Sequence, residues 1–244
     1  VPWAQTRRHG LDAPKPRTPG TLRIASYNIE NLFDDKDDPK LTGSAEDSSM
    51  TKPEDDRANA ALAIRLIDAD IVALEEVESL DAVKWFRDQF LKDMGYEYVE
   101  SLDAGDGRGI EQAVMSRFPL SDPKVWPSQD LGGTHPRRRN ADPGSEPGKP
   151  IVLHRSPFLV NVKVPAGSLK DATGKGMDKD YAFTMMVLHH KSGKPNGYWR
   201  EAEAKRFVQW AKELEKSNPN LNLLLCGDFN ARAGDASMGT YFDA

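Results

Sequence analysis

The stretch Leu223–Asp235, LLLCGDFNARAGD, joins an apolar run directly to a group of polar residues. The run Leu-Leu-Leu-Cys predicts a buried strand, and Gly-Asp-Phe-Asn follows where that strand should end. Asp228 and Asn230 are therefore expected at a strand exit, where a rigid element can hold side chains in place for chemistry.

Three other predicted strands end in polar side chains of a similar kind. These pairs are Asn28 and Glu30 after TLRIASYNIE, Glu75 and Glu76 in DIVALEEV, and His189 and His190 in YAFTMMVLHH. Each pair alone has a structural interpretation, because Glu can cap a following helix, Asn forms turns and Asp makes Asx-turns. Their joint occurrence at four exits favours a functional site.

Hydrolysis of a phosphate ester uses this combination of side chains. The Glu76 carboxylate can hold Mg²⁺, which keeps several waters and takes its remaining ligands from the substrate phosphate. The amides of Asn28 and Asn230 can donate to phosphate oxygens without adding negative charge. Asp228 can orient or deprotonate the attacking water, and a histidine such as His189 can donate a hydrogen bond or a proton to the phosphoryl group.

Composition bounds these functions only loosely. The chain has 244 residues, 29% of them charged, and a net charge of −5, so it carries no global attraction to nucleic acid, although a local basic groove would suffice. No apolar run approaches the roughly 18 residues of a membrane span, so no integral membrane contact is expected. One cysteine, Cys226, excludes an internal disulfide. The chain begins at Val1 rather than Met, which leaves an exported, extracytoplasmic protein open as one explanation.

The order of predicted elements indicates an α/β fold. Strands alternate with helices in the first and last thirds of the chain, and strands follow one another in the middle, a pattern typical of helices outside packed mixed sheets. We expect an irregular lead-in over residues 1–20 and a single domain over residues 21–244. IEQAVMSRFPL is expected to form one strand, and residues 128–148 one long loop.

Five blocks carry a resemblance to a known family. SYNIENLFD, ALEEVES, GIEQAVMSRFPL, VLHHKSG and LLLCGDFNA resemble, in order, the signature blocks of the endonuclease/exonuclease/phosphatase superfamily, whose fold is DNase I-like. The resemblance implies a four-layer α-β-β-α sandwich of two mixed sheets, with the site at one end. It also implies a metal-dependent phosphoric ester hydrolase.

The resemblance implies a role for each matching residue. Those matched to catalytic positions are Asn28, Glu111, His189, Asp228 and Asn230, with Glu111 expected to pair with His189. Those matched to phosphate contacts are Arg155, Asn28 and Asn230, and those matched to the metal site are Glu76 and Asn28. The implied cofactor is Mg²⁺, with Mn²⁺ as an alternative.

The chain also departs from the family pattern. Relatives continue into further strands and a Ser-Asp-His block, whereas all five histidines here precede Asp228. We therefore expect a domain whose C-terminal part is missing, and weak catalysis by the chain as it stands.

The leading functional hypothesis is a phosphodiesterase, with nucleic acid as the favoured substrate. HPRRRN, which contains Arg137 to Arg139, is the best local candidate for a contact with a DNA backbone, the alternative being a solvated loop. DDKDD, Asp34 to Asp38, is either a solvated acidic loop or a further cation site. The alternative functions are a phosphatase, a phospholipid phosphodiesterase, or a non-catalytic binding module on the same fold.

Overall fold

A computed structural model describes residues 13–36, 50–137 and 145–244. Its elements over these ranges are β1 (Ile24–Leu32), α1 (Glu54–Ile67), β2 (Ile71–Val77), α2 (Leu80–Phe90), η3 (Lys92–Met94), β3 (Tyr98–Ser101), β4 (Glu111–Ser116), β5 (Leu120–Lys124), β6 (Asp130–Thr134), β7 (Pro150–Val152), β8 (Phe158–Val164), β9 (Tyr181–His189), η4 (Lys194–Asn196), α3 (Gly197–Ser217), β10 (Leu223–Asp228) and α4 (Ala236–Phe242).

Two four-stranded sheets form the centre of the molecule. The first has the order β1-β2-β4-β3, with β1 parallel to β2 and the other pairs antiparallel. The second has the order β10-β9-β8-β5, with β10 parallel to β9 and the other pairs antiparallel. The prediction of two mixed sheets is confirmed, and a short β6–β7 pair lies apart from both.

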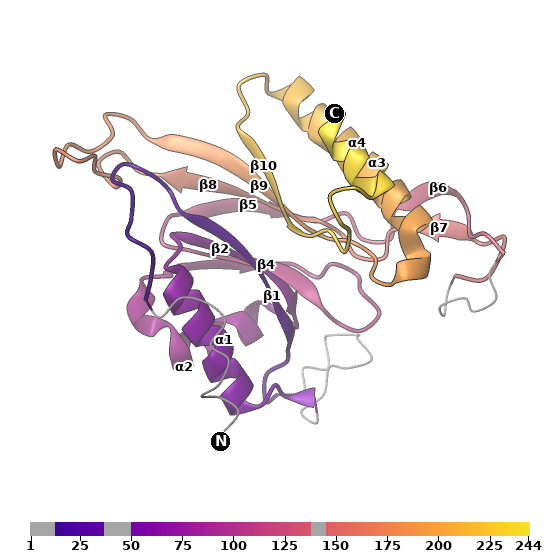
Figure 1. The fold of residues 1–244 in the computed structure, drawn as a ribbon, viewed down its shortest axis with the longest axis horizontal. Helices are drawn as coiled ribbons and strands as arrows, with labels where there is room; N and C mark the ends of the chain where they lie inside the picture. The colour runs from indigo at the N-terminus through magenta and orange to yellow at the C-terminus, as the bar shows by residue number, and fades with distance from the viewer. Residues whose placement is uncertain (1–12, 37–49, 138–144) are drawn as a thin grey trace.

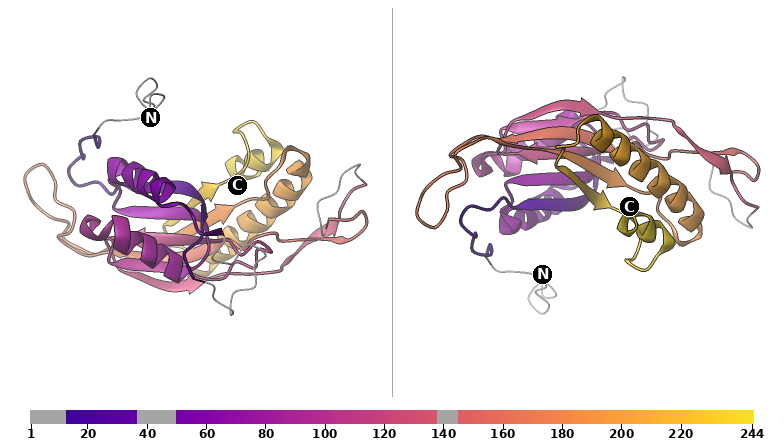
Figure 2. Two further views of the ribbon diagram at one scale, coloured as in Figure 1. Left: turned by 90° about the horizontal axis from the view of Figure 1, so that it is seen from below. Right: turned by 90° about the horizontal axis from the view of Figure 1, so that it is seen from above.

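Helices cover the outer face of each sheet, as Figures 1 and 2 show, with α1 and α2 on one side and α3 and α4 on the other. The alternation along β2 explains this arrangement, because Ile71 and Ala73 pack between the sheets while Val72 and Leu74 face the first pair of helices. The helix α3 packs through Phe207 on the outer face of the second sheet. The four-layer sandwich of the DNase I-like fold is thus confirmed.

Two of the predicted element boundaries are wrong. The block expected to form a single strand is two strands, because the backbone leaves β4 after Ser116 and crosses at Arg117–Pro119 to the second sheet as β5. The expected loop over residues 128–148 contains β6, which pairs with β7. Both differences depend on strand partners distant in sequence, which local patterning does not register.

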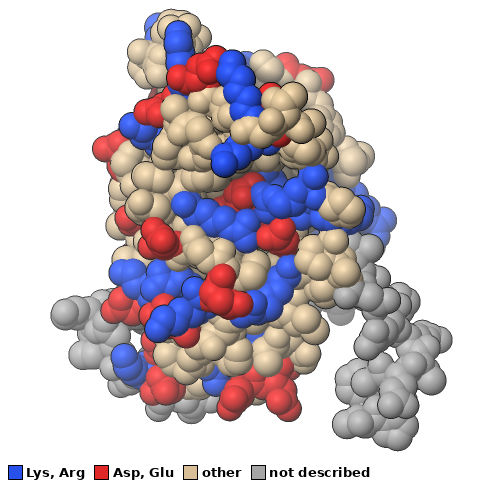
Figure 3. Space-filling model, turned by 90° about the vertical axis from the view of Figure 1, so that its left-hand side faces the viewer, with Lys and Arg blue, Asp and Glu red and all other residues tan. Residues whose placement is uncertain are grey.

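An ion-pair network closes the end of the sandwich at which β1 and β2 begin. Asp68 and Asp70 both pair with Arg17 and Arg117, so residues 13–23, which form no helix or strand, are anchored to the first sheet's end. Figure 3 shows the molecule from the left of Figure 1, where Lys and Arg side chains are interspersed with Asp and Glu. This end carries no single-sign patch.

Among the residues that the structure describes, no helix combines the length and the apolar character needed to cross a membrane.

Candidate active site

The middle of β1 and the ends of β2, β9 and β10 bring four of the predicted residues together. The expected exit of the first strand at Asn28 is wrong, because β1 runs on to Leu32, with a register shift after Asn28. The amide nitrogen of Asn28 lies 3.1 Å from Asp228 Oδ2 and 3.4 Å from Glu76 Oε1. The imidazole Nε2 of His189 lies 3.7 Å from Glu76 Oε1 and 3.9 Å from Asp228 Oδ2. Residues up to 200 positions apart thus meet around two carboxylates, which one hydrated Mg²⁺ and a phosphate could bridge.

An irregularity in β2 places Glu76 at this centre. Glu75 follows the strand alternation and faces the space between the sheets, so a regular strand would turn Glu76 toward the helices. Instead, the register of β2 shifts between Glu75 and Val77, and Glu76 takes a left-handed conformation with φ of 63°. Left-handed backbone at a residue with a side chain is uncommon and concentrates at functional sites.

The irregular part of β1 and the turn after β10 show the same feature. Glu30, Asn31 and Asn230 also have positive φ values, of 58°, 57° and 46°. Asn230 closes a tight turn, since its backbone N–H donates to Asp228 Oδ1 at 2.8 Å and its side-chain amide donates to the His190 carbonyl at 3.0 Å. Asp228 is thereby fixed in orientation while its side chain stays 30% exposed, open to water.

The Asn28 side chain acts as a donor toward the two carboxylates. Its oxygen accepts a hydrogen bond from the backbone N–H of Glu30 at 2.9 Å, so the amide nitrogen is the group that faces Glu76 and Asp228. This orientation suits holding the carboxylates and contacting a phosphate oxygen. Direct ligation of a metal by Asn28 remains a prediction, which this orientation does not favour.

His189 is buried at the floor of the site. Burial, with the positive charges of Arg155 and Arg108 next in effect, lowers its pKa to about 2. The ring is therefore neutral at physiological pH, and its Nε2 side faces the two carboxylates. A neutral ring protonated at Nε2 can donate a hydrogen bond into the site. The other expected role, transfer of a proton to the phosphoryl group, needs a charged imidazole and is disfavoured by this low pKa.

Arg155 is almost fully buried, and its positive charge helps to lower the pKa of His189. Its Nε donates to Asp106 Oδ2 at 2.6 Å, while its Nη1 is buried and has no hydrogen-bond partner among the described residues. A buried donor without a partner is costly, so a free Arg155 nitrogen close to His189 is consistent with its predicted contact to a phosphate oxygen.

Glu111 opens β4 at the same end of the first sheet, opposite Val77. Its carboxylate is buried and accepts a hydrogen bond from Ser101 Oγ at 2.5 Å. The ion pairs of His189 among the described residues go to Glu76 and Asp228. The pairing of Glu111 with His189 therefore stays a prediction.

His190 has a structural position. Its Nδ1 lies 2.9 Å from Glu203 Oε2 on α3, and its Nε2 lies 2.7 Å from the hydroxyl of Tyr241 on α4. These contacts tie the end of β9 to both outer helices. The catalytic role of His189 stays a prediction, and His190 has no free ring nitrogen for such a role.

Arg108 belongs to this site although the sequence did not single it out. Its guanidinium lies 3.6 Å from Glu76 Oε2 and 3.3 Å from Asn31 Oδ1, and its side chain is 47% exposed. It can thus meet an anionic substrate from the solvent side. The available signal was the segment GDGRG, a glycine-rich loop with one Arg directly before the strand of Glu111.

The residues present fit one divalent cation with few protein ligands. No group of three or more His, Cys, Asp or Glu side chains with metal-binding geometry occurs in the described ranges. Glu76 and Asp228 supply two converging carboxylates, which is typical of Mg²⁺, since that ion keeps most of its waters. Of these two, Glu76 is the less exposed and is held by Asn28 and Arg108.

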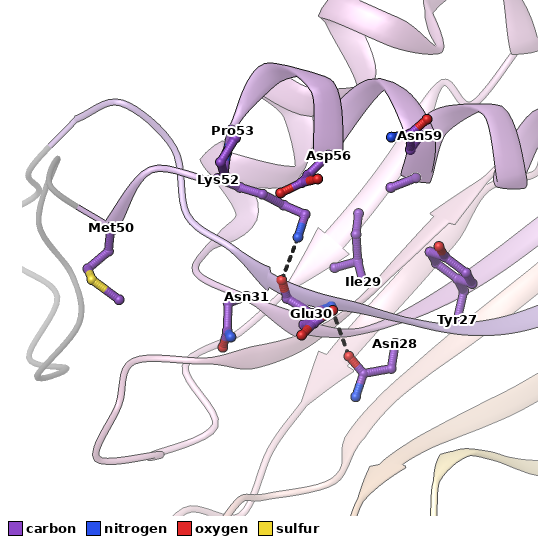
Figure 4. Close-up of a pocket in the computed structure, with 11 residues that line it drawn as sticks. Tyr27, Asn28, Ile29, Glu30, Asn31, Met50, Lys52, Pro53, Asp56 and Asn59 are labelled. Atoms are coloured by element: carbon purple, nitrogen blue, oxygen red, sulfur yellow. Dashed lines mark hydrogen bonds between the residues drawn. The ribbon is translucent and has the colours of Figure 1, made fainter. Parts of the chain in front are cut away.

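A polar cavity of about 460 Å³ adjoins the site on the outer side of β1. Figure 4 shows it between β1 and the start of α1, with Asn28 at one end and Lys52 reaching down to the Glu30 carbonyl at 2.8 Å. Glu30 and Asp56 also line it. The mixture of charges gives this cavity no clear preference for an anion.

Two loop predictions fall partly outside the described residues. Arg138 and Arg139 of HPRRRN lie outside them, and Arg137 is exposed. Asp37 and Asp38 of the acidic loop also lie outside. Within it, Asp34 is buried, and burial raises the pKa of its carboxyl group.

Glu75 yields a prediction about pH and stability. Ser26 Oγ donates to its carboxylate at 2.9 Å, and burial raises its pKa from 4.5 to about 8. Between these values the folded chain keeps a proton that the unfolded chain loses, so stability falls as pH rises. We expect Glu75→Gln to remove this loss and to raise stability at pH 8 relative to the wild type, by on the order of 1–4 kcal/mol. The melting temperatures of both proteins in EDTA at pH 5 and pH 8 measure this effect. If the difference in melting temperature between the two proteins were the same at both pH values, the raised pKa of Glu75 would be contradicted.

Comparison with known proteins agrees with this geometry. The sequence profile of the endonuclease/exonuclease/phosphatase family matches residues 25–241. No curated protein sequence matched the chain.

Solved structures show the same fold at low identity. The human Nocturnin catalytic domain with bound sulfate superposes with a TM-score of 0.53 at 13% identity, over 93% of this chain and 71% of that one. ANGEL2, a 2′,3′-cyclic phosphatase, superposes with a TM-score of 0.56 at 16% identity, over 91% of this chain and 57% of ANGEL2. An endonuclease/exonuclease/phosphatase family protein from Bacteroides thetaiotaomicron superposes with a TM-score of 0.52 at 19% identity, over 91% of this chain and 66% of that one.

The profile match covers most of the chain, including every residue that carries an acidic, amide or imidazole group of the candidate site. This chain belongs to the endonuclease/exonuclease/phosphatase family, whose members hydrolyse phosphate esters.

Proposed function

We propose that this protein is a Mg²⁺-dependent phosphodiesterase that acts on nucleic acid. The observation that carries the proposal is the convergence of Glu76 and Asp228 on the Asn28 amide and the His189 imidazole. The arrangement offers oxygen ligands to a hard cation and donors to a phosphate side by side.

The cation's part would be to neutralise charge on the phosphoryl and leaving oxygens, with Glu76 as the principal residue that holds it. The Asn28 amide keeps both carboxylates in place and can turn a hydrogen to a non-bridging phosphate oxygen. Arg108 adds positive charge from the solvent side, and the buried Arg155 adds positive charge that acts on His189.

Asp228 is the residue that would orient the attacking water. Its Oδ1 accepts the N–H of Asn230 and its Oδ2 accepts the Asn28 amide, so both oxygens are fixed while the side chain stays partly exposed. A water bound there can pass a proton to the carboxylate as it attacks phosphorus. His189 donates a hydrogen bond to the phosphoryl group as negative charge develops on it.

Hydrolysis assays on the full-length protein test this function. We expect cleavage of plasmid DNA and bis-p-nitrophenyl phosphate with Mg²⁺ or Mn²⁺, and none with EDTA, because the carboxylates alone cannot neutralise the phosphate. RNA, sphingomyelin and a phosphate monoester form the comparison arms. Metal-dependent turnover of sphingomyelin or the monoester alone would contradict the nuclease assignment, and absence of turnover on every substrate would contradict the proposed activity as a whole.

A further inference from the structure

A second cavity, of about 570 Å³, opens beside Asn230 on the side away from β1. The loop after β9, the first turn of α3 and the loop after β10 enclose it. Its lining residues are Gly193, Lys194, Arg200, Asn230, Ala231, Arg232 and Asp235. Three of these side chains are cationic and one is a carboxylate, so the cavity favours an anion.

The cations of this cavity lack carboxylate partners. Within the described ranges, no Asp or Glu oxygen forms an ion pair with Lys194, Arg200 or Arg232. The Asp235 side chain accepts from the backbone N–H of Arg232 at 3.0 Å, not from its guanidinium. The cavity therefore holds three cationic side chains against one carboxylate, an excess of positive charge that a bound anion would offset.

Arg200 makes the cavity a built feature rather than a chance grouping of surface side chains. It is 6% exposed, and its Nη1 donates to the carbonyls of Lys191 at 3.1 Å and Gly193 at 2.8 Å. Its Nε is buried without a hydrogen-bond partner among the described residues. Arg200 thus fixes the wall of the cavity and carries a buried positive charge into it, while Lys194 and Arg232 stay exposed.

The cavity is joined to the catalytic centre through a single residue. Asn230 lines it, and the backbone N–H of the same Asn230 is bound to Asp228 Oδ1. Because Asn230 borders both places, a substrate bound at Asp228 needs a second phosphate along the same strand to contact the cavity.

We propose that Lys194 and Arg232, in the cavity whose wall Arg200 fixes, bind the phosphate that neighbours the scissile one in a nucleic-acid strand. The inference rests on the proposed function and extends it, because it makes a second phosphate a determinant of substrate choice. Lys194 and Arg232 contact the phosphate oxygens, and Arg200 positions the loop and supplies background charge.

The test compares a double variant, Lys194→Ala with Arg232→Ala, with a control that removes two charges elsewhere. The matched control is Lys212→Ala with Lys216→Ala. Both side chains are exposed near the C-terminal end of α3, a helix about 30 Å long whose first turn borders the cavity. Arg200 is left unchanged because its loss would disturb the loop. The readouts are KM and kcat on an oligonucleotide, kcat/KM on bis-p-nitrophenyl phosphate, and binding of a labelled single-stranded oligonucleotide in EDTA by fluorescence anisotropy.

We expect the cavity variant to raise the oligonucleotide KM by about tenfold or more, through the loss of two charge-assisted contacts. A plot of the logarithm of the oligonucleotide binding constant against the logarithm of salt concentration should become less steep by about 0.7 for each lost contact. Turnover of bis-p-nitrophenyl phosphate should stay within about twofold of the wild type. The control should match the wild type in all three.

Binding in EDTA separates this inference from the proposed activity, because it needs no turnover. Oligonucleotide affinity and salt slope unchanged in the cavity variant would overturn the inference even if the wild type hydrolyses DNA. An equal loss on the single-phosphate substrate would overturn it too, since the cavity would then serve the scissile phosphate or the fold. A wild type that binds the oligonucleotide through the cavity without cleaving it would support the inference and refute the proposed activity.

Discussion

Replacing Glu76 by Gln in the full-length protein is expected to lower kcat/KM for bis-p-nitrophenyl phosphate by about 10²–10⁴-fold at fixed Mg²⁺. The change keeps the size of the side chain and removes its charge. A metal ion contributes several kcal/mol of charge stabilisation in the transition state, and each 1.4 kcal/mol corresponds to about tenfold in rate. Calorimetric titration with Mg²⁺ should show the matching loss of metal affinity without any turnover.

Glu75→Gln is the matched control for this experiment, because it makes the same change one residue earlier in the chain. Glu75 faces the space between the sheets, and its pKa of about 8 leaves it mostly protonated at pH 7, so Gln replaces a neutral side chain there. Its metal affinity and turnover should stay close to those of the wild type. Wild-type Mg²⁺ dependence in Glu76→Gln, or an equal loss in both variants, would refute Glu76 as the principal metal residue.

Replacing Gly227 by Ala is expected to unfold the protein or to lower its stability by several kcal/mol. Gly227 pairs with Leu188 across β9 and β10, and its φ is 132°, in a region that residues with side chains avoid. A Cβ at this position would lie 2.0 Å from the Leu188 carbonyl oxygen. Both obstacles are backbone, so no side chain can move to relieve the clash.

Chemical denaturation monitored by circular dichroism measures this effect. Gly239→Ala is the control, since a Cβ there meets no atom within 4 Å and the residue lies in α4, where Ala is favoured over Gly. The control should equal or slightly exceed the wild type in stability. A Gly227→Ala protein of wild-type stability would show that β9 and β10 are not as close as the structure places them.

The motif at Gly227 and Asp228 links the packing of two strands to the candidate site. The glycine allows β10 to approach β9, and this approach sets Asp228 opposite His189 in the strand register. The aspartate then receives the Asn28 amide from the other sheet. The close approach of β10 to β9 within one sheet thus helps to align the Asp228 carboxylate with Asn28 on the opposite sheet.

The sequence by itself determined the fold class and most of the residues that meet at the candidate site. Apolar runs that end in polar pairs indicated which strands would carry the chemistry, and the order of five blocks indicated the family. These features are local, because a strand exit and its side chains lie within a few residues of each other.

The tertiary structure decided how these groups point and which others join them. The left-handed turn of Glu76 depends on a register shift against β4, and the split of β4 from β5 depends on which sheet each strand joins. Arg108 and the cavity of Lys194, Arg200 and Arg232 depend on loops that meet only after both sheets pack. Such contacts link residues far apart in the chain, and a periodic pattern holds no information on them, so only the packed molecule could place them.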